Sequence, residues 1–223
     1  MENYNENNIM EIGGTVVEAP EFSHEIYEEK FYRFCIQTKR LSDVYDVLPI
    51  IISERLIPDE GINVGEIVQI NGQVRSHNKQ VGTRSKLVLS IFAKELEKTS
   101  DEDILTLNDA SFNGFLCKAP IYRKTPLGRE IADILVAVNR SYKKSDYIPC
   151  ILWGRNAKFC EKLEVGTNVK LSGRVQSRKY EKVQEDGTTK EMVAYELSVS
   201  KFSVVKEDIK EISEQRINVE AEE

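Results

Sequence analysis

The chain has no apolar run that approaches the roughly 20 residues a helix needs to cross a bilayer. It also lacks the start of a signal peptide, which is basic and then apolar, because its first residues, MENYNENN, are rich in Asn and Glu. Both absences argue against a membrane partner. We therefore expect a cytoplasmic protein.

Cysteine and histidine are scarce as well. The four cysteines have no CxxC spacing, and the two histidines, His24 and His77, lie far apart. Zinc sites and disulfide frameworks need a closer spacing of such residues, so we expect reduced thiols and neither a metal nor another cofactor. Since the chain also has no P-loop, no cluster of carboxylates with histidine and no Ser/His/Asp set, nothing in it indicates an enzyme.

What the chain does contain is an internal repeat. GTVVEAP starts at Gly14, and GFLCKAP starts 100 positions later, at Gly114. After a slip of one residue, INGQVRS from Ile70 matches LSGRVQS from Leu171. Two copies of one module therefore account for most of the chain.

The two copies set the expected domain boundaries. Residues 9–97 form the first domain and residues 108–206 the second. The segment KTSDEDILTL joins them, and its acidic run indicates a solvated connector. Residues 207–223 follow as an acidic C-terminal tail.

Each copy has the pattern of a small all-β domain. In the second copy, five segments alternate in the manner of strands: 111–118, 129–140, 146–153, 168–179 and 192–205. A short helical stretch, RNAKFCEKL, lies between the third and the fourth. Five strands with one helix suggest a Greek-key barrel of the OB type rather than a sandwich, which needs more strands. Because the first copy repeats this order, we predict two tandem five-stranded OB-fold barrels, each with one short helix between strands three and four.

The third and fourth strands of the second copy carry unusual outward faces. Tyr147 and the only tryptophan, Trp153, lie opposite the apolar residues that suit the core. The outward parity of the fourth strand gives a cationic row that ends in a ring. Its members are Lys170, Ser172, Arg174, Gln176, Arg178 and Tyr180. Cations that follow phosphates, beside rings that stack on bases, are typical of a surface that binds single-stranded nucleic acid.

Charge is distributed unevenly along the chain. Residues 1–110 carry 11 Lys and Arg against 20 Asp and Glu, a net −9. Residues 111–206 carry 18 against 10, a net +8, and residues 207–223 carry 2 against 7, a net −5. The overall charge of −6 therefore hides a basic module between acidic flanks, which indicates that the second copy is the nucleic-acid binder.

The same residues allow other interpretations. Exposed Tyr and Trp side chains also cover dimer interfaces or the open end of a barrel, and a row of Lys and Arg is often only a solvated face. Rings and cations together favour nucleic acid, because the core of a protein interface is usually depleted of charge. Stacking and phosphate contacts do not by themselves exclude RNA.

Residues 108–206 resemble the bacterial single-stranded DNA-binding protein family. The resemblance rests on YRKTPLGREIADILVAVNRSYKK, DYIPCILWGRNAKF, LEVGTNVKLSGRVQSRKYE and the strand after EDGTTKEMV, in this order. It implies a five-stranded OB barrel, which agrees with the strand count. It also implies sequence-independent binding of single-stranded DNA in replication, repair or recombination.

In that family, aromatic residues at four positions stack on the bases. By motif, these positions are Tyr142, Tyr147, Trp153 and Tyr180. The resemblance and the cationic row together indicate a group of phosphate contacts. Its members are Arg123, Lys124, Arg129, Arg140, Lys143, Lys144, Arg155, Lys170, Arg174, Arg178 and Lys179.

The chain departs from the family at its tail and in its two barrels. Family tails end in a short hydrophobic tip that recruits repair and replication proteins, whereas EDIKEISEQRINVEAEE is acidic and has no such tip. Most members carry one barrel per chain and assemble as tetramers. Some carry two barrels and form dimers, so we expect a homodimer that holds four barrels.

The first copy lacks the stacking residues. It has Ser42, Val47, Ser53 and Lys79 at the matching positions, although Tyr45 could restore one stacking site. We infer that this copy keeps the barrel core, has lost most DNA affinity and serves assembly or a protein partner. An alternative for the whole chain is an OB-fold interaction module of a replication or mobile-element complex, in which nucleic-acid binding is incidental.

Overall fold

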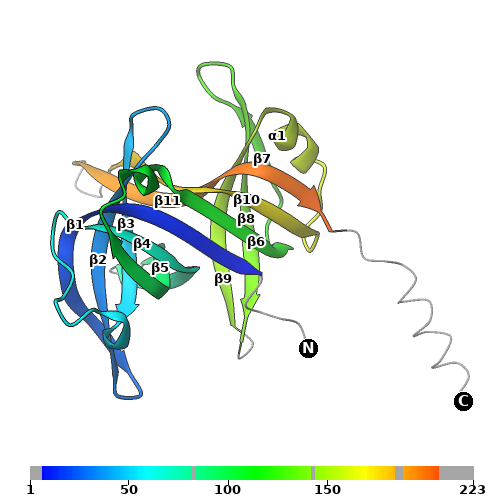
Figure 1. The fold of residues 1–223 in the computed structure, drawn as a ribbon. Coiled ribbons are helices and arrows are strands. Elements are labelled where there is room, and N and C mark those ends of the chain that lie inside the picture. The colour runs from blue at the N-terminus through cyan, green and yellow to red at the C-terminus, as the bar shows by residue number, and fades with distance from the viewer. Residues whose placement is uncertain (1–6, 82–83, 142–143, 184–187, 206–223) are drawn as a thin grey trace, which may run out of the picture.

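The structure, a computed structural model, describes residues 7–81, 84–141, 144–183 and 188–205. Within these residues, eleven strands form one continuous sheet in the order β2-β3-β5-β4-β1-β6-β10-β11-β9-β8-β7. The sheet closes on itself twice, through the pairings β1–β2 and β6–β8. Figure 1 shows the result, two barrels side by side with β1 and β6 running between them.

Barrel one closes from the strands of the first copy. They are β1 (Asn8–Ile26), β2 (Glu29–Lys39), β3 (Tyr45–Ser53), β4 (Ile67–Val81) and β5 (Arg84–Thr99). Neighbouring strands are antiparallel except β3 and β5, which run parallel with Ile50 opposite Ile91. One parallel pair in a closed five-stranded barrel is what the OB order of strands requires.

Barrel two repeats this arrangement. Its strands are β6 (Asn108–Leu116), β8 (Glu130–Arg140), β9 (Lys144–Trp153), β10 (Asn168–Val183) and β11 (Thr189–Val204). A further short strand, β7 (Ile121–Lys124), pairs with β8 as a hairpin. The five predicted strand segments thus all form strands, and the prediction of two OB-fold barrels is confirmed.

The cores follow the predicted alternation, because successive side chains of a strand point to opposite faces. In β9 and β10 the inward side chains are almost fully buried. They are Ile148, Cys150, Leu152, Val169, Leu171 and Val175. Burial in such surroundings raises the pKa of the Cys150 thiol well above its ordinary value, which keeps it protonated.

The helix between strands three and four differs between the barrels. Barrel two has the predicted helix as α1 (Gly154–Cys160), whereas barrel one has only the 3₁₀ turn η1 (Glu54–Leu56). The reason lies in Pro58, because the α conformation is disfavoured for a residue that precedes a proline. Ile57 is indeed extended. The prediction of a short helix is thus met in barrel two, and in barrel one it is reduced to a single turn.

The connector between the barrels is packed rather than fully solvated. It contains the 3₁₀ helix η2 (Glu102–Thr106), whose acidic residues are exposed but whose Ile104 is half-buried. A Cβ at Gly13 would collide with the carbonyl oxygen of Ile104, so glycine is required for this close approach. The Thr38 hydroxyl donates to the Leu105 carbonyl at 3.1 Å. The expectation of a solvated connector was therefore wrong for its apolar half.

An approximate two-fold axis relates the barrels. Strands β1 and β6 pair antiparallel, with Met10 opposite Ala110, Asn8 opposite Phe112 and Ile12 opposite Asn108. Equivalent residues of the two copies are 100 positions apart, so the pair Asn8–Phe112 is equivalent to the pair Asn108–Ile12. The axis that exchanges these two pairs therefore passes beside Met10 and Ala110. The edges of both barrels are thereby covered, which removes two exposed strand edges.

At the barrel junction, Asp46 of β3 reaches β10 of the other barrel. Its buried carboxylate accepts hydrogen bonds from the backbone N–H of Ser177 at 2.7 Å and from Nε of Arg40 at 2.8 Å. Arg174 adds an ion pair at 3.5 Å. Burial alone would raise the pKa of Asp46, but the hydrogen bonds from Arg40 and Ser177 outweigh it and hold the pKa below the ordinary 3.8.

The counterpart of Asp46 is Asp146 on β9, which is also fully buried and reaches β4 of barrel one. Its carboxylate accepts hydrogen bonds from the Ser76 N–H at 2.7 Å and from Arg75 at 3.0 Å, and Arg140 lies 3.7 Å away. Each barrel thus binds the other through one buried aspartate. This reciprocal contact fixes the outer faces of β9 and β10 relative to barrel one.

Candidate nucleic-acid interface

Two predicted stacking residues lie at opposite ends of β9. Tyr147 is 44% exposed and Trp153 is 37% exposed. Between them Pro149 is half-buried and Ile151 is buried, so this face is open only at its ends. At about 3.3 Å per residue, the six residue steps separate the two rings by roughly 20 Å. The two rings are therefore placed to meet different nucleotides.

Hydrogen bonds hold both of these residues. The indole Nε1 of Trp153 donates to the Ser198 hydroxyl of β11 at 3.2 Å. The backbone N–H of Tyr147 donates to the Ser76 hydroxyl at 2.7 Å, and Ser76 belongs to barrel one. One edge of the indole is therefore fixed, and barrel one helps to position Tyr147.

The third ring, Tyr180 on β10, is half-buried. The guanidinium of Arg178 lies 5.7 Å from its ring centroid, which is a cation–π contact. Nε of Arg178 also donates to Glu196 at 3.4 Å. Tyr142, the fourth predicted ring, lies outside the described residues.

Five of the predicted cations have carboxylate partners. The pairs are Arg123–Asp133 at 2.6 Å, Arg140–Asp146 at 3.7 Å, Arg174–Asp46 at 3.5 Å, Arg178–Glu196 at 3.4 Å and Lys179–Glu191 at 2.9 Å. A phosphate would have to compete with these partners. Their role in phosphate binding stays a prediction.

Arg174 has the least accessible of these side chains, at 23% exposure. Burial lowers its pKa, and the Asp46 carboxylate opposes that shift. Its position at the barrel junction indicates that it holds the barrels together, beside the predicted phosphate contact.

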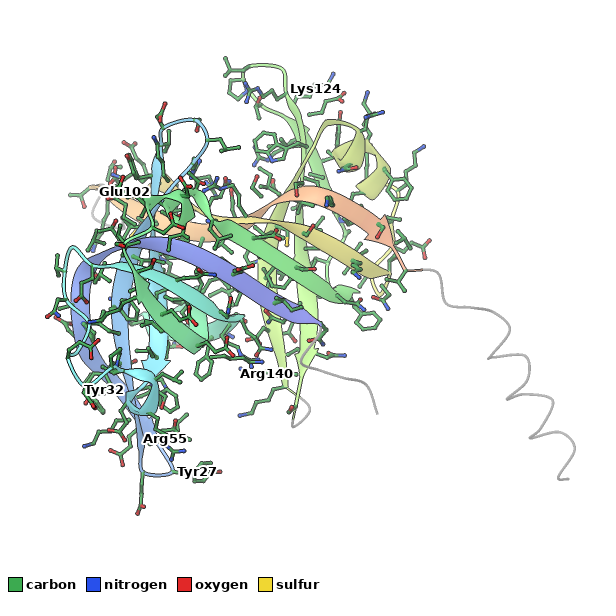
Figure 2. All side chains as sticks on the ribbon, viewed as in Figure 1. Tyr27, Tyr32, Arg55, Glu102, Lys124 and Arg140 are labelled. Atoms are coloured by element: carbon green, nitrogen blue, oxygen red, sulfur yellow. The ribbon has the colours of Figure 1, made fainter. Side chains whose placement is uncertain are left out.

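Five further predicted cations, all in the described part of the chain, have no carboxylate partner. Among the residues that the structure describes, five are exposed and form no side-chain ion pair: Lys124, Arg129, Lys144, Arg155 and Lys170. Lys143 lies outside the described residues. Figure 2 shows Lys124 and Arg140 at opposite ends of barrel two, which strand β8 spans over about 33 Å, and the free Lys144 lies opposite Arg140 in the β8–β9 ladder. Positive charge thus extends along the whole barrel, as a long polyanion requires.

Barrel one has no aromatic side chain at the positions that match the four predicted stacking rings. Ser53 is buried, whereas Ser42, Val47 and Lys79 are exposed. Tyr45 is 52% exposed and lies on the same face as Val47, so it is placed to act as a single ring.

Sequence reasoning missed the residues that position the rings. Ser76 and Ser177 are the final serines of INGQVRS and LSGRVQS, and each binds strand three of the opposite barrel. Their recurrence in both copies was a signal for that role. Ser198 had no comparable signal. Within the described part of the chain, no group of three or more His, Cys, Asp or Glu side chains is arranged to hold a metal ion. None of its helices is long and apolar enough to span a membrane.

Known proteins resemble the second copy in sequence. A model of the single-strand binding protein family matches residues 107–205. Single-stranded DNA-binding protein B of Bacillus subtilis (strain 168) is 38% identical over 84 residues, which are 33% of this chain and 72% of that protein. The single-stranded DNA-binding protein of Oceanobacillus iheyensis is 33% identical over 90 residues, which are 37% of this chain and 55% of that protein.

The fold has a solved counterpart. The wild-type single-stranded DNA binding protein from Thermus aquaticus matches with a TM-score of 0.73 at 14% identity, over 90% of this chain and 93% of that one. At this identity the likeness concerns the fold alone. The family match, in contrast, concerns the sequence of barrel two, and the Bacillus relative adds a likeness in sequence at 38% identity. On these grounds the chain belongs to the single-strand binding protein family.

Proposed function

We propose that barrel two binds single-stranded DNA without sequence preference. The observation that carries this proposal is the exposure of Tyr147 and Trp153 on a barrel with free cations along its length. Every base offers a flat face for stacking, worth about 1 to 3 kcal/mol per base, and cations hold the phosphates whatever the sequence. Such binding covers and protects the single strands of replication, repair and recombination.

Trp153 is the only tryptophan and therefore reports on its own site. We expect its fluorescence to fall when unlabelled oligo-dT is added, and the affinity to fall steeply as salt is raised. A titration at low and high salt measures both. An unresponsive Trp153 at low salt would favour the interaction module, and oligo-U in parallel shows whether RNA binds as well.

Tyrosine substitutions test the division between the barrels. Tyr147→Ala removes an exposed ring from barrel two, and we expect the Kd for oligo-dT to rise roughly 5- to 150-fold, from the loss of one stacked base. Tyr45→Ala is the matched change in barrel one and should alter the Kd little. Equal losses in the two variants would contradict the proposal that barrel two is the main binder.

The exposed apolar residues of barrel one indicate a second function, contact with a protein. The turn between β2 and β3 exposes Leu41 and Val44, and the start of β3 exposes Tyr45 and Val47, whereas the equivalent segment of barrel two is cationic. Exposed apolar residues that gather in one place mark interaction sites. We propose that this turn serves assembly or a partner in replication or repair.

We propose further that two chains associate into a homodimer with four barrels. The tandem barrels support this, because a pair of such chains supplies the same number of barrels as four single-barrel chains.

A further inference from the structure

A groove lies between the two barrels on the side of Pro149. Its walls come from Lys86–Leu89 on β5 of barrel one and from Arg178, Tyr180 and Val193–Glu196 of barrel two. Its volume of about 290 Å³ is close to the roughly 300 Å³ of the smallest ligand sites. The groove thus joins a predicted stacking residue of barrel two to barrel one.

The groove has a much smaller counterpart at the barrel junction near Pro49. Leu89 of β5 and Tyr195 of β11 are equivalent, since each lies opposite the final serine of the repeated motif. Near Pro49, where Tyr195 lines the junction, a space of only about 10 Å³ remains. Leu89 and Tyr195 line both spaces, and the one near Pro149 is the larger.

The groove combines a flat ring with two cations. The guanidinium of Arg178 lies over Tyr180, with 5.7 Å to the ring centroid. Nζ of Lys86 donates to the carbonyl of Val193 at 3.4 Å, which holds this ammonium at the wall formed by the two barrels. A ring beside cations suits a nucleobase with its phosphate.

Glu196 adds a buried acceptor to the same groove. Its carboxylate takes hydrogen bonds from Gln176 at 3.0 Å and from Arg178 at 3.4 Å. A carboxylate has about four acceptor sites, so capacity remains for an N–H group of a base, such as the N3–H of thymine. With Lys86 and Arg178 against Glu196, the groove keeps a net positive charge, which favours a polyanionic strand over an apolar segment.

We propose that this groove is a nucleobase subsite, at which the bound strand passes from barrel two onto barrel one. The inference rests on the proposed function and extends it, because it gives barrel one a DNA contact despite its lack of stacking rings. The occupant is a segment of the same single strand that contacts Trp153.

Lys86→Ala tests the subsite, with Lys30→Ala as a control. Both changes remove one cation from barrel one, but the exposed Lys30 lies on the β1–β2 hairpin and does not line the groove. For oligo-dT of about 30 nucleotides, enough to cover two barrels, we expect Lys86→Ala to raise the Kd several-fold. It should also lower the slope of log K against log salt by about 0.7, the value for one lost phosphate contact of a single strand. Lys30→Ala should match the unsubstituted protein.

Leu89→Tyr fills the groove with the residue that the equivalent position already has. We expect a raised Kd and a smaller number of nucleotides covered per chain, with Trp153 quenching retained. If this variant does not fold, Lys86→Ala decides alone. Quenching of Trp153 with an unchanged Kd and salt slope in Lys86→Ala would overturn the groove and leave the proposed function standing. Absence of quenching in the unsubstituted protein would remove both.

Discussion

Within the described part of the chain, the indole of Trp153 makes one side-chain hydrogen bond, from its Nε1 to the Ser198 hydroxyl. A ring that is already fixed loses less freedom when a base stacks on it, so its binding costs less entropy. We therefore expect Ser198 to act as a positioning residue rather than as a DNA contact, through the orientation of the indole.

We expect Ser198→Ala to weaken DNA binding modestly. The net value of one hydrogen bond is about 0.5 to 1.5 kcal/mol, which corresponds to a rise in Kd of roughly two- to tenfold. The emission spectrum of Trp153 should change in the free protein as well, because its environment changes without DNA. Ser200→Ala is the control, since the Ser200 hydroxyl donates to the Ser172 carbonyl and does not touch Trp153. Identical spectra for all three proteins would contradict this positioning role.

Single residues also show what the sequence could predict. The parity of β9 placed Tyr147 and Trp153 on the outer face, because alternation is a local property. The partner of Arg174 was not predictable, because Asp46 belongs to the other barrel and meets it only in the folded chain. The alternation of β10 therefore predicted correctly that Arg174 points outward, but it did not predict that Asp46 is its partner.

At the scale of elements, the junction depends on β3 reaching β10. Removing the charge of Asp46 leaves Arg40 and Arg174 together without their shared carboxylate. Breaking a buried ion pair on one side typically costs about 3 kcal/mol or more. We expect Asp46→Asn to lower the free energy of unfolding by about this amount, measured by urea denaturation. Asp43→Asn is the control, because Asp43 is exposed and pairs with Lys39, and it should leave the free energy of unfolding unchanged. Equal effects of the two changes would contradict the role of Asp46 at the barrel junction.

The same carboxylate predicts a dependence of stability on pH. The pKa of Asp46 is held below 3.8 in the folded chain, so the unfolded chain takes up its proton first as the pH falls. Its contribution is complete well above pH 3.8 and is lost as the pH falls through the folded pKa. We expect the Tm difference between the native protein and Asp46→Asn to shrink as the pH is lowered from 6 towards 3, about one unit below that reference. A constant difference would argue against a charged Asp46.

The secondary-structure elements also show which features sequence patterns could and could not predict. Five strands per copy were predictable from alternation. The helix of barrel one is reduced to a single turn because of Pro58. The similarity of the two copies gives no sign of this difference. The connector was judged by its charge, whereas Ile104 and the space left by Gly13 decide how it packs.

For the whole molecule, the pairing of β1 with β6 joins two barrels within one chain. Covalent linkage makes this contact independent of protein concentration. A further association of two chains does depend on it. We expect light scattering to give twice the chain mass of 25.5 kDa at micromolar concentrations, and the two-barrel unit to persist on dilution. A mass of one chain at every concentration would contradict the homodimer.

The unequal outer faces of the two barrels give the chain a direction. A dimer of identical barrels is two-fold symmetric and treats the 5′ and 3′ ends of a strand alike. Here the stacking rings lie on one barrel and the open groove on one side of the axis. We infer that, within one chain, a strand that crosses both barrels meets them in a set order, a polarity that a pair of identical barrels lacks.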